Sequence, residues 1–323
     1  MEEIMKKGFF VILFLLAAVF LTACGPAERT YYFASQTPTD TSSWVYWVVV
    51  VKEGDKIVDA EWNAFNIEGD ANATYQGKDK VTASEEHIYN MNSTLWWHEQ
   101  AQLVIDKFIE TGDVNDREPA PAGVSITTDE FYTLAELALA SEPVAAGEYE
   151  EGYHFVSLKS TASNHAPVYY YDPVKETVVS TGAWDAYSFG SFVVVNGKIV
   201  LAYFNNVFYG YKAIVENGFV KKQSMDHDND PETANINVSL MASYTTANPK
   251  LLKTKNQLGT SYGMAGASPI GKEYFQQAKT AGDYLITNQE FPAVNDNGDF
   301  DSVSGVTITA SDFVALWEEL PKK

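Results

Sequence analysis

The chain contains two copies of one short pattern, one in each half. "PAPAGVSITTDEF" occupies residues 119–131, and "DSVSGVTITASDF" occupies residues 301–313. Both copies contain Gly-Val, then Ser or Thr, then Ile-Thr, and end with an acidic residue ahead of Phe. Self-similarity of this kind indicates an internal duplication, so one structural plan must fold twice within the chain.

The segments upstream of each copy predict a β-hairpin. Residues 44–65, "WVYWVVVVKEGDKIVDAEWNAF", place two β-branched and aromatic runs on either side of a Lys-Glu-Gly-Asp turn. Residues 191–208, "SFVVVNGKIVLAYFNNVF", repeat the arrangement with Asn196-Gly197 at the turn. Asn-Gly between apolar runs is among the strongest local signals for a hairpin.

Helical periodicity follows each hairpin. Residues 95–113 carry apolar side chains at helical spacing, and residues 269–289 form a weaker partner interrupted by Gly282, with a matching Gln-Ala pair at Gln277. A shorter helix is expected after each Gly-Val pattern, at residues 129–140 and 311–320. The apolar positions expected on the buried faces of these helices are Ala101, Val104, Ile105 and Phe108, then Phe131, Leu134 and Ala138, and finally Phe313, Leu316 and Leu320.

Each half therefore predicts a hairpin, a helix, a Gly-Val turn and a short helix. Antiparallel hairpins mixed with helices favour an α+β fold over a doubly wound parallel sheet. We predict two tandem domains, residues 31–145 and 146–323, with the seam at residues 141–147. Residues 210–260 form an extra insertion in the second copy. Its acidic tract "MDHDNDPE" (225–232) lacks the glycine and the final acidic residue of a calcium loop, which favours a solvated loop.

Charge and composition limit the functional classes. The formal net charge of −21, from 43 acidic and 22 basic residues, disfavours nucleic-acid binding because that function needs a basic surface. Aromatic residues make up 14% of the chain. Such a surplus fits a protein that holds flat ligands, but it fits a β-rich core equally well, and composition alone favours the core.

The amino-terminal residues indicate export and lipid attachment. A short basic region at Lys6 and Lys7 precedes an uninterrupted apolar stretch, residues 8–23, that is shorter than a bilayer-spanning helix. The stretch ends in Leu-Thr-Ala-Cys24, which resembles the lipobox of bacterial lipoproteins. The resemblance implies a signal peptide at residues 1–23, a palmitate-type lipid on Cys24, and a lipidated tether over residues 24–30. A plain secretory signal is the alternative.

Cys24 is the only cysteine of the chain, which rules out intramolecular disulfides, CxxC redox centres and cysteine-ligated iron–sulfur clusters. Any redox role must therefore come from a bound organic cofactor.

The Gly-Val copies have the local chemistry of a phosphate site. Gly305 allows a large group to approach the backbone, and Thr307 precedes a helix whose free N–H groups favour an anion. Ser311 and Asp129 are expected to cap the two short helices. A hydroxyl in this position can bind a phosphate or be joined to one. The alternative is an ordinary strand, turn and cap.

The second copy resembles the flavinylation motif of the FMN-binding domain family. That motif is an aspartate, two variable residues, Ser-Gly, a small residue, the acceptor threonine, and a Ser or Thr two positions later. The matching residues are Asp301, Ser304, Gly305, Thr307 and Thr309. The resemblance implies that a flavin transferase, using FAD and Mg²⁺, joins FMN through its phosphate to the Thr307 hydroxyl.

The first copy departs from this motif. Gly123 and Thr127 match, and Ser125 holds the acceptor position, but Ala122 replaces the serine and Pro119 replaces the aspartate. Serine can accept a phosphoester, whereas the missing aspartate weakens the expected recognition by the transferase. The sequence therefore predicts one or two covalently bound FMN groups.

Together, the lipobox, the acidic chain and the two repeats resemble extracellular electron-transfer flavoproteins of Gram-positive bacteria, of the pheromone-encoding lipoprotein A type. The resemblance implies a membrane-anchored electron carrier, not an enzyme, on the outer face of the cell membrane. Its flavins would receive electrons from a membrane NADH dehydrogenase and the quinone pool, and pass them to extracellular acceptors such as ferric iron or free flavins.

Three aromatic residues, Trp96, Trp97 and Tyr262, are candidates for contact with the flavin rings, with a place in the core as the alternative. The rival interpretation of the whole chain is a non-redox surface lipoprotein that binds a small solute or a wall polymer.

Overall fold

The computed structural model describes residues 28–38, 43–165, 169–172, 177–180, 184–208, 214–216, 219–221 and 254–323. The predicted signal peptide, the lipid site at Cys24 and the acidic tract at 225–232 lie outside these residues. Within the described ranges, no helix has the length and apolar character needed to cross a bilayer.

The described chain is a mixed α+β fold in which the strands pair antiparallel. Its first half contains β1 (Arg29–Ser35), β2 (Trp44–Glu53), β3 (Lys56–Asn66), η1 (Gly69–Ala71), α2 (Lys80–Glu85), α3 (Trp97–Thr111) and α4 (Asp129–Leu139). Its second half contains β4 (Gly152–Ser157), η2 (Lys159–Thr161), β5 (Ser163–His165), β6 (Tyr169–Asp172), β7 (Thr177–Ser180), β8 (Trp184–Val195), β9 (Lys198–Val207), β10 (Ile214–Glu216), β11 (Phe219–Lys221), α6 (Lys255–Leu258), η3 (Gly259–Tyr262), η4 (Met264–Gly266), α7 (Tyr274–Asn288) and α8 (Ser311–Glu318).

Both predicted hairpins are confirmed. β2 and β3 pair around a turn in which Gly54 has φ 62°, and β8 and β9 pair around Asn196-Gly197, where both residues have positive φ. Each hairpin also has a register shift at the same distance from its turn, after Val51 in one and after Val193 in the other. A shared bulge is a detailed structural likeness between the two halves.

Each hairpin gains a third strand that the sequence analysis did not predict. β1 pairs with β2 in the first half, and β4 pairs with β8 in the second, so the sheets run β1-β2-β3 and β4-β8-β9. β1 begins at Arg29, so the last residues of the predicted tether already belong to the sheet. The second half also has an additional excursion between β4 and β8, which contains β5 to β7.

The helices lie where the periodicity predicts them, with ends shifted by a few residues. α3 begins at Trp97 and α7 at Tyr274, both after capping boxes in which a Glu or Gln side chain accepts from the cap N–H. The predicted apolar faces are buried: every residue expected there is at most 5% exposed. The connection between α4 and β4, residues 140–151, contains the predicted seam.

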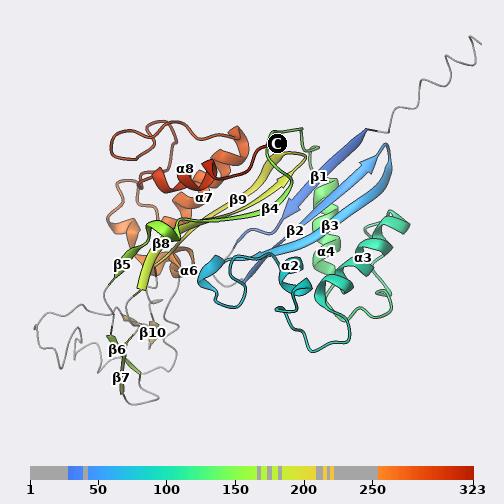
Figure 1. Ribbon diagram of the computed structural model, residues 1–323, viewed down its shortest axis with the longest axis horizontal. Helices are drawn as coiled ribbons and strands as arrows, with labels where there is room; N and C mark the ends of the chain where they lie inside the picture. Colours follow the sequence, from blue (N-terminus) through green and yellow to red (C-terminus); the bar gives the residue numbers. More distant parts are fainter. Residues whose placement is uncertain are drawn as a thin grey trace, which may run out of the picture.

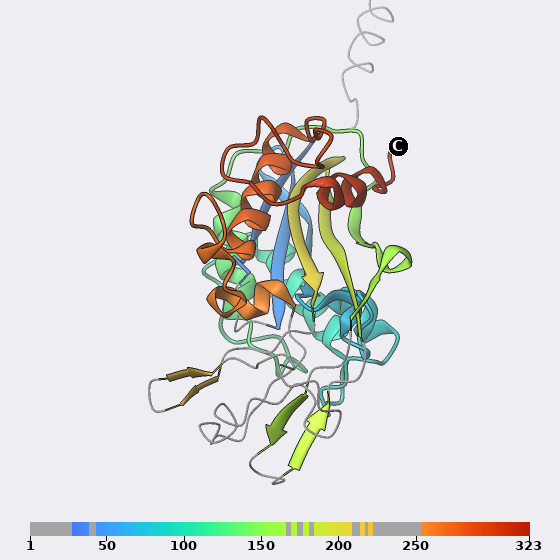
Figure 2. The ribbon, with the colours of Figure 1, turned by 90° about the vertical axis from the view of Figure 1, so that its left-hand side faces the viewer.

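The molecule is a four-layer sandwich (Figure 1). One core lies between the sheet β1-β2-β3 and helices α3 and α4, and another lies between β8-β9 and helices α7 and α8. Figure 2 shows α7 and α8, in orange and red, covering β8 and β9. A third core joins the two sheets face to face through apolar side chains such as Trp47, Phe65, Phe189 and Val193.

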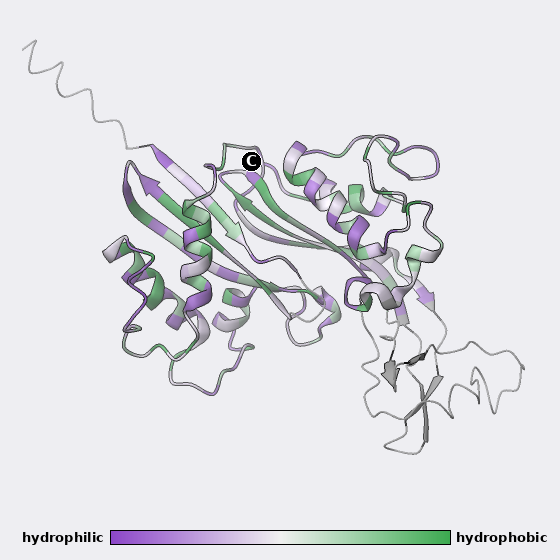
Figure 3. Ribbon diagram, turned by 180° about the vertical axis from the view of Figure 1, so that it is seen from behind, coloured by the Kyte–Doolittle hydropathy of each residue, from purple (hydrophilic) through white to green (hydrophobic). Residues whose placement is uncertain are grey.

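Hydrophobic residues gather along the central strands in Figure 3, whereas the helices carry both kinds of residue. This pattern follows from the layers, because the strands are covered on both faces and the helices on only one. The large aromatic content is largely structural: the fully buried side chains include Trp47, Trp62, Phe108, Phe192 and Phe204.

Candidate functional site

The two Gly-Val segments form the same turn. Gly123 has φ 92° and Gly305 has φ 88°, a left-handed conformation that favours glycine. The N–H of Val124 donates to Pro121 O at 3.1 Å, and the N–H of Val306 donates to Val303 O at 3.4 Å. The turn is therefore preserved although the residues before the glycine differ.

A fully buried glutamine holds the second turn in place. Gln277 of α7 is 0% exposed, and its Oε1 accepts from the Thr307 N–H at 2.7 Å and from the Thr307 hydroxyl at 3.2 Å. Its Nε2 donates to Lys272 O at 3.2 Å and to Ser268 Oγ at 3.3 Å. One amide thus ties the acceptor residue to the start of α7.

Gln100 does the same for the first turn. It is also 0% exposed, and its Oε1 accepts from the Ser125 N–H at 2.6 Å and from the Ser125 hydroxyl at 3.2 Å. Its Nε2 donates to Leu95 O at 2.9 Å and to Ser93 Oγ at 3.1 Å. The sequence showed the repeated Gln-Ala pair, but periodicity alone could not show that this side chain reaches the acceptor turn.

The predicted site residues of each half lie together on the surface. Ser125 and Thr307 are exposed, as are Asp301, Ser304 and Thr309 in the second half and Gly123 and Thr127 in the first. Asp301 Oδ1 accepts from the Asn295 side-chain amide at 2.9 Å, which orients this carboxylate within the loop. Ser125 and Thr307 therefore both lie at the surface.

The prediction that Ser311 and Asp129 cap the short helices is wrong. Both are the first helical residue, and the caps are Ala310 and Thr128, neither of which makes a side-chain capping bond. In the second half, Gly298 O accepts from the N–H groups of Ala310 and Ser311, at 2.6 and 3.1 Å. Because a backbone carbonyl already occupies these donors, the start of α8 offers less to a phosphate than its sequence suggests.

A lysine lies beside the glycine of the second turn. A Cβ added to Gly305 would come within 3.1 Å of Lys272 Nζ, whereas one added to Gly123 would come within 3.0 Å of Leu95 Cδ1. Lys272 and Leu95 are equivalent, since each offers the backbone carbonyl that the buried glutamine contacts. The lysine beside the second glycine is therefore replaced by a leucine at the first, where Lys107 instead donates to Pro119 O at 3.0 Å.

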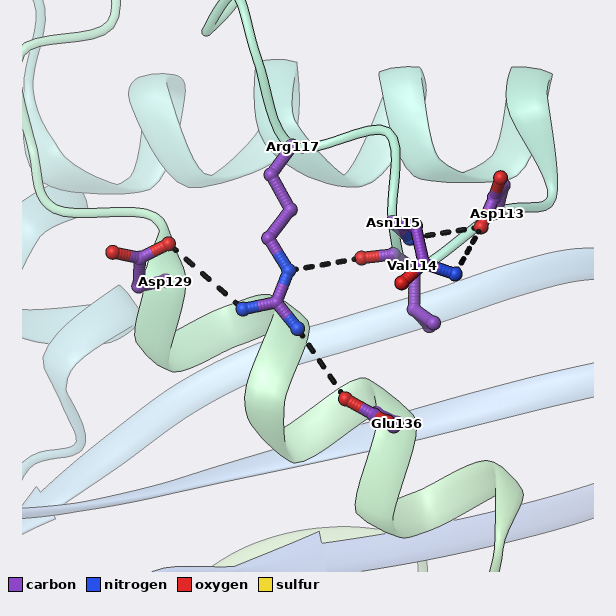
Figure 4. A network of polar contacts seen from close by, with 6 residues as sticks. All are labelled: Asp113, Val114, Asn115, Arg117, Asp129 and Glu136. Atoms are coloured by element: carbon purple, nitrogen blue, oxygen red, sulfur yellow. Dashed lines mark hydrogen bonds and ion pairs between the residues drawn. The ribbon is translucent and has the colours of Figure 1, made fainter.

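An arginine fixes the connection that carries Ser125 (Figure 4). Arg117 donates to Val114 O at 3.1 Å and reaches two carboxylates of α4, Glu136 at 3.3 Å and Asp129 at 3.9 Å. Asp113 Oδ1 accepts from the backbone and side chain of Asn115 at 2.8 and 3.0 Å. The loop between α3 and α4 is thus anchored on α4 just upstream of the acceptor turn.

Each half also has a lysine surrounded by aromatic rings. Lys80 is 2% exposed, and its Nζ lies 4.4 to 5.2 Å from the ring centroids of Trp44, Tyr46, Tyr89 and Trp97. It also contacts the Tyr46 hydroxyl. Burial lowers the pKa of Lys80 to about 7, and the nearby Glu130 carboxylate acts in the opposite direction.

Lys255 also lies among aromatic rings, in the second half. Its Nζ lies 4.9 Å from the ring centroid of Tyr274, 5.3 Å from that of Tyr262 and 5.8 Å from that of Phe208. Burial lowers its pKa, opposed by Asp312. The Tyr274 hydroxyl is buried and has no hydrogen-bond partner among the described residues.

The three aromatic residues considered for ring contact have different environments. Trp97 is 3% exposed and belongs to the core of the first half. Trp96 is half-buried and stacks on His87, with ring centroids 4.2 Å apart. Tyr262 meets Phe208 edge-on at 5.2 Å. The core alternative thus holds for Trp97, while Trp96 and Tyr262 remain partly accessible.

A cavity of about 480 Å³ lies between the halves, bounded by the end of β1, by β9 and by α7. Its walls include Gln36, Tyr203 and Phe275. Within the described ranges, no cluster of His, Cys, Asp or Glu is arranged to hold a metal ion.

Comparison with protein-family models finds no match, and comparison with curated proteins finds none either. Among solved structures, the chain is similar to a Clostridium thermocellum protein determined by NMR in solution. The two are 31% identical over 35% of this chain and 90% of that one, with a TM-score of 0.26. At this TM-score the likeness says nothing about fold or function.

Proposed function

We propose that this protein is a lipid-anchored, extracellular electron carrier with FMN bound covalently through a phosphoester. Thr307 is the main attachment site and Ser125 a second one, in two FMN-binding-like repeats. The resemblance of residues 301–309 to the flavinylation motif supplies the chemistry. Cys24 supplies the lipid anchor, which places the protein on the outer face of the cell membrane.

One observation carries the proposal. Both halves present an exposed hydroxyl after a left-handed glycine, and a fully buried glutamine binds the amide and the hydroxyl of that residue. The glutamine satisfies backbone N–H groups of the turn, and its additional contact with the exposed hydroxyl in both halves is the feature that supports the proposal. The contact fixes the hydroxyl oxygen and accepts its hydrogen, which leaves the oxygen lone pairs available to form a bond.

The attachment step balances with FAD as the co-substrate of a Mg²⁺-dependent flavin transferase. The hydroxyl oxygen of Thr307 bonds to the phosphorus of the FMN part, the pyrophosphate bond breaks, AMP leaves and the hydroxyl proton is released. The described residues fit a phosphate at this point, because Lys272 lies beside Gly305 and can pair with its charge. Leu95 provides no such partner at Ser125, so we expect Ser125 to be modified less completely.

When bound, FMN supplies reversible electron transfer that the side chains of this chain cannot perform. The protein holds the cofactor outside the cell, where a freely dissociating flavin would be lost. A membrane NADH dehydrogenase and the quinone pool are the proposed donors, and ferric iron or free flavins the proposed acceptors. In this role the protein is a carrier and not an enzyme.

The decisive experiment is mass spectrometry of the mature protein co-expressed with a flavin transferase. We expect an FMN adduct on the peptide containing Thr307, and a yellow colour that survives denaturation. Thr307→Val should remove this adduct alone, and Ser125→Ala should remove any adduct on the first repeat. An unmodified Thr307 peptide from an active transferase reaction would refute the proposal.

The cavity between the halves is the observation that favours the alternative, a non-redox lipoprotein that binds a small solute. A colourless protein that binds a solute in this cavity, with no adduct on Thr307 or Ser125, would establish that alternative.

A further inference from the structure

Lys80, which is buried, and Lys255, which is half-buried, occupy the same position in the two repeats. Each is the first residue of a short helix after its N-cap, Asp79 or Thr254. Asn63 of β3 donates to the Asp79 carboxylate at 2.9 Å, and Asn205 of β9 donates to the Thr254 hydroxyl at 2.8 Å. Each asparagine also accepts from the N–H of the residue after the lysine, at 3.1 Å.

The surroundings of these lysines differ, but the lysine itself is present in both repeats. Trp97 at the start of α3 corresponds to Tyr274 at the start of α7, and Tyr46, counted back from the shared bulge, corresponds to Ser188. A lysine placed among aromatic rings loses the stabilisation that water gives its charge, and cation–π contacts with the rings replace only part of it. Its presence in both repeats, while the neighbours differ, points to a role for a cation in each.

Each lysine contacts the helix whose glutamine holds one of the two turns. Trp97 contacts Lys80, and Gln100, three residues later on α3, holds Ser125. Tyr274 contacts Lys255, and Gln277, three residues later on α7, holds Thr307. Three residues correspond to a rise of about 4.5 Å along a helix. The helix that positions each acceptor therefore also positions the aromatic wall of each lysine.

Neither ammonium group has a close counter-ion. Among the described residues, no carboxylate lies within 4.0 Å of Lys80 or Lys255, although Glu130 and Asp312, at the starts of α4 and α8, act on them from farther away. Tyr46 and Tyr89 also face Lys80, and Tyr262 and Tyr274 also face Lys255. Within the described part of the chain, each repeat thus has a lysine without a close carboxylate, and its protonated form can compensate a negative charge on a ligand.

We propose that Lys80 and Lys255 are redox-tuning residues, whose ammonium groups stabilise the negative charge that a flavin ring gains on reduction. This inference rests on the proposed function. The ribityl chain separates the flavin ring from its phosphate, so two different cations serve the two ends. In the second repeat, Lys272 serves the phosphate end and Lys255 the ring end.

The charge balance sets the sign of the effect. A quinol donor gives up two electrons and two protons; the ring takes both electrons and one proton, and solvent takes the other proton. The ring then carries one negative charge, which a nearby ammonium favours relative to the neutral oxidised ring. Removing the ammonium must therefore lower the midpoint potential of the flavin in the same repeat.

The test measures the midpoint potential of the mature protein after the flavin transferase has attached FMN. Ser125→Ala is included in every variant so that the only flavin measured is the one on Thr307. Lys255→Met should lower the equilibrium constant for reduction by at least about tenfold, or about 30 mV for a two-electron couple. Lys279→Met is the matched control, because this exposed lysine on α7 pairs with Asp283. The control should leave the potential unchanged.

Asp312→Asn supplies a change of the opposite sign. Removing this carboxylate should raise the potential, because it takes a negative charge away from the ring and from Lys255. Lys80→Met, the lysine variant of the other repeat, should leave the potential of the Thr307 flavin unchanged. A lysine with a purely structural role would not give shifts of opposite sign from two variants that both fold.

The outcomes separate the two proposals. A loaded protein in which neither Lys255→Met nor Asp312→Asn shifts the potential beyond the control overturns the redox-tuning role and leaves the proposed function intact. If Lys255→Met fails to fold, Lys255→Gln takes its place, with the same lowering of the potential expected and an unchanged potential overturning the role. Absence of an adduct from the parent protein overturns both.

Discussion

Replacing Gln100 by leucine tests the contact that links each acceptor turn to its helix. Leucine is similar in size to glutamine, so the substitution mainly removes the side-chain amide and its hydrogen bonds. Three backbone partners are left without it: the Ser125 N–H at 2.6 Å, the Ile126 N–H at 3.2 Å and the Leu95 carbonyl at 2.9 Å. A buried polar group without a partner costs about 1–3 kcal/mol, and water reaching the exposed turn offsets part of this. We therefore expect a loss of about 2–4 kcal/mol in the free energy of unfolding.

The assay is urea unfolding of the mature protein, with Gln102→Leu as the matched control. Gln102 lies on the same helix, is exposed, and donates only to Asp106. Its replacement should change the free energy of unfolding by less than about 0.5 kcal/mol. Gln277→Leu should repeat the large effect in the second half.

Equal stability of Gln100→Leu and Gln102→Leu would refute the argument, since the buried amide would then contribute no more than a surface one. A second readout concerns function. Gln277→Leu should reduce flavin attachment at Thr307 in protein that is still folded, without affecting Ser125.

Three further predictions concern charge, backbone and location. The Lys80 pKa is lowered from 10.5 to about 7. Between these pH values the unfolded chain binds a proton that the folded chain lacks. The free energy of unfolding, compared with that of Lys80→Met, should therefore rise with pH by up to about 1.4 kcal/mol per pH unit. Urea unfolding at about pH 6, 8 and 10 checks this, and a flat difference would contradict it. Gly305→Ala should lower the free energy of unfolding, measured with heat or urea, by about 1–2 kcal/mol because the φ of Gly305 is 88°. Gly266→Ala should lower it less, because a Cβ at Gly266 meets no neighbouring atom among the described residues. Equal losses in the two variants would argue against backbone strain at Gly305. Cys24→Ser should move the protein from the membrane fraction to the medium, and retention in the membrane would count against the lipid anchor.

Elements with a strong local signal were predictable. Asn196-Gly197 specifies a hairpin because both residues tolerate positive φ, and the apolar spacing of α3 and α4 specifies which faces are buried. The first strand of each sheet was missed because β1 and β4 lack clean alternation: their residues are mostly half-buried, and their register depends on pairing with β2 and β8.

Some features of the candidate site were likewise predictable from local sequence, and others were not. Sequence alone specifies the glycine turn and the hydroxyl residue two positions after it, because both depend on residues within a few positions of one another, and the repetition of the pattern indicates the duplication. It places the helix caps wrongly, because the start of α8 is satisfied by Gly298, a residue in a distant part of the loop.

Only the tertiary structure decides what surrounds each acceptor. Gln100 lies 25 residues from Ser125 and Gln277 lies 30 residues from Thr307, and no local pattern joins such pairs. The lysines of α2 and α6 look like ordinary surface residues in the sequence, yet packing of the hairpin against the helices buries Lys80 among four rings. The physical reason is that backbone turns are set by neighbouring residues, whereas burial and long-range hydrogen bonds exist only after the layers have packed together.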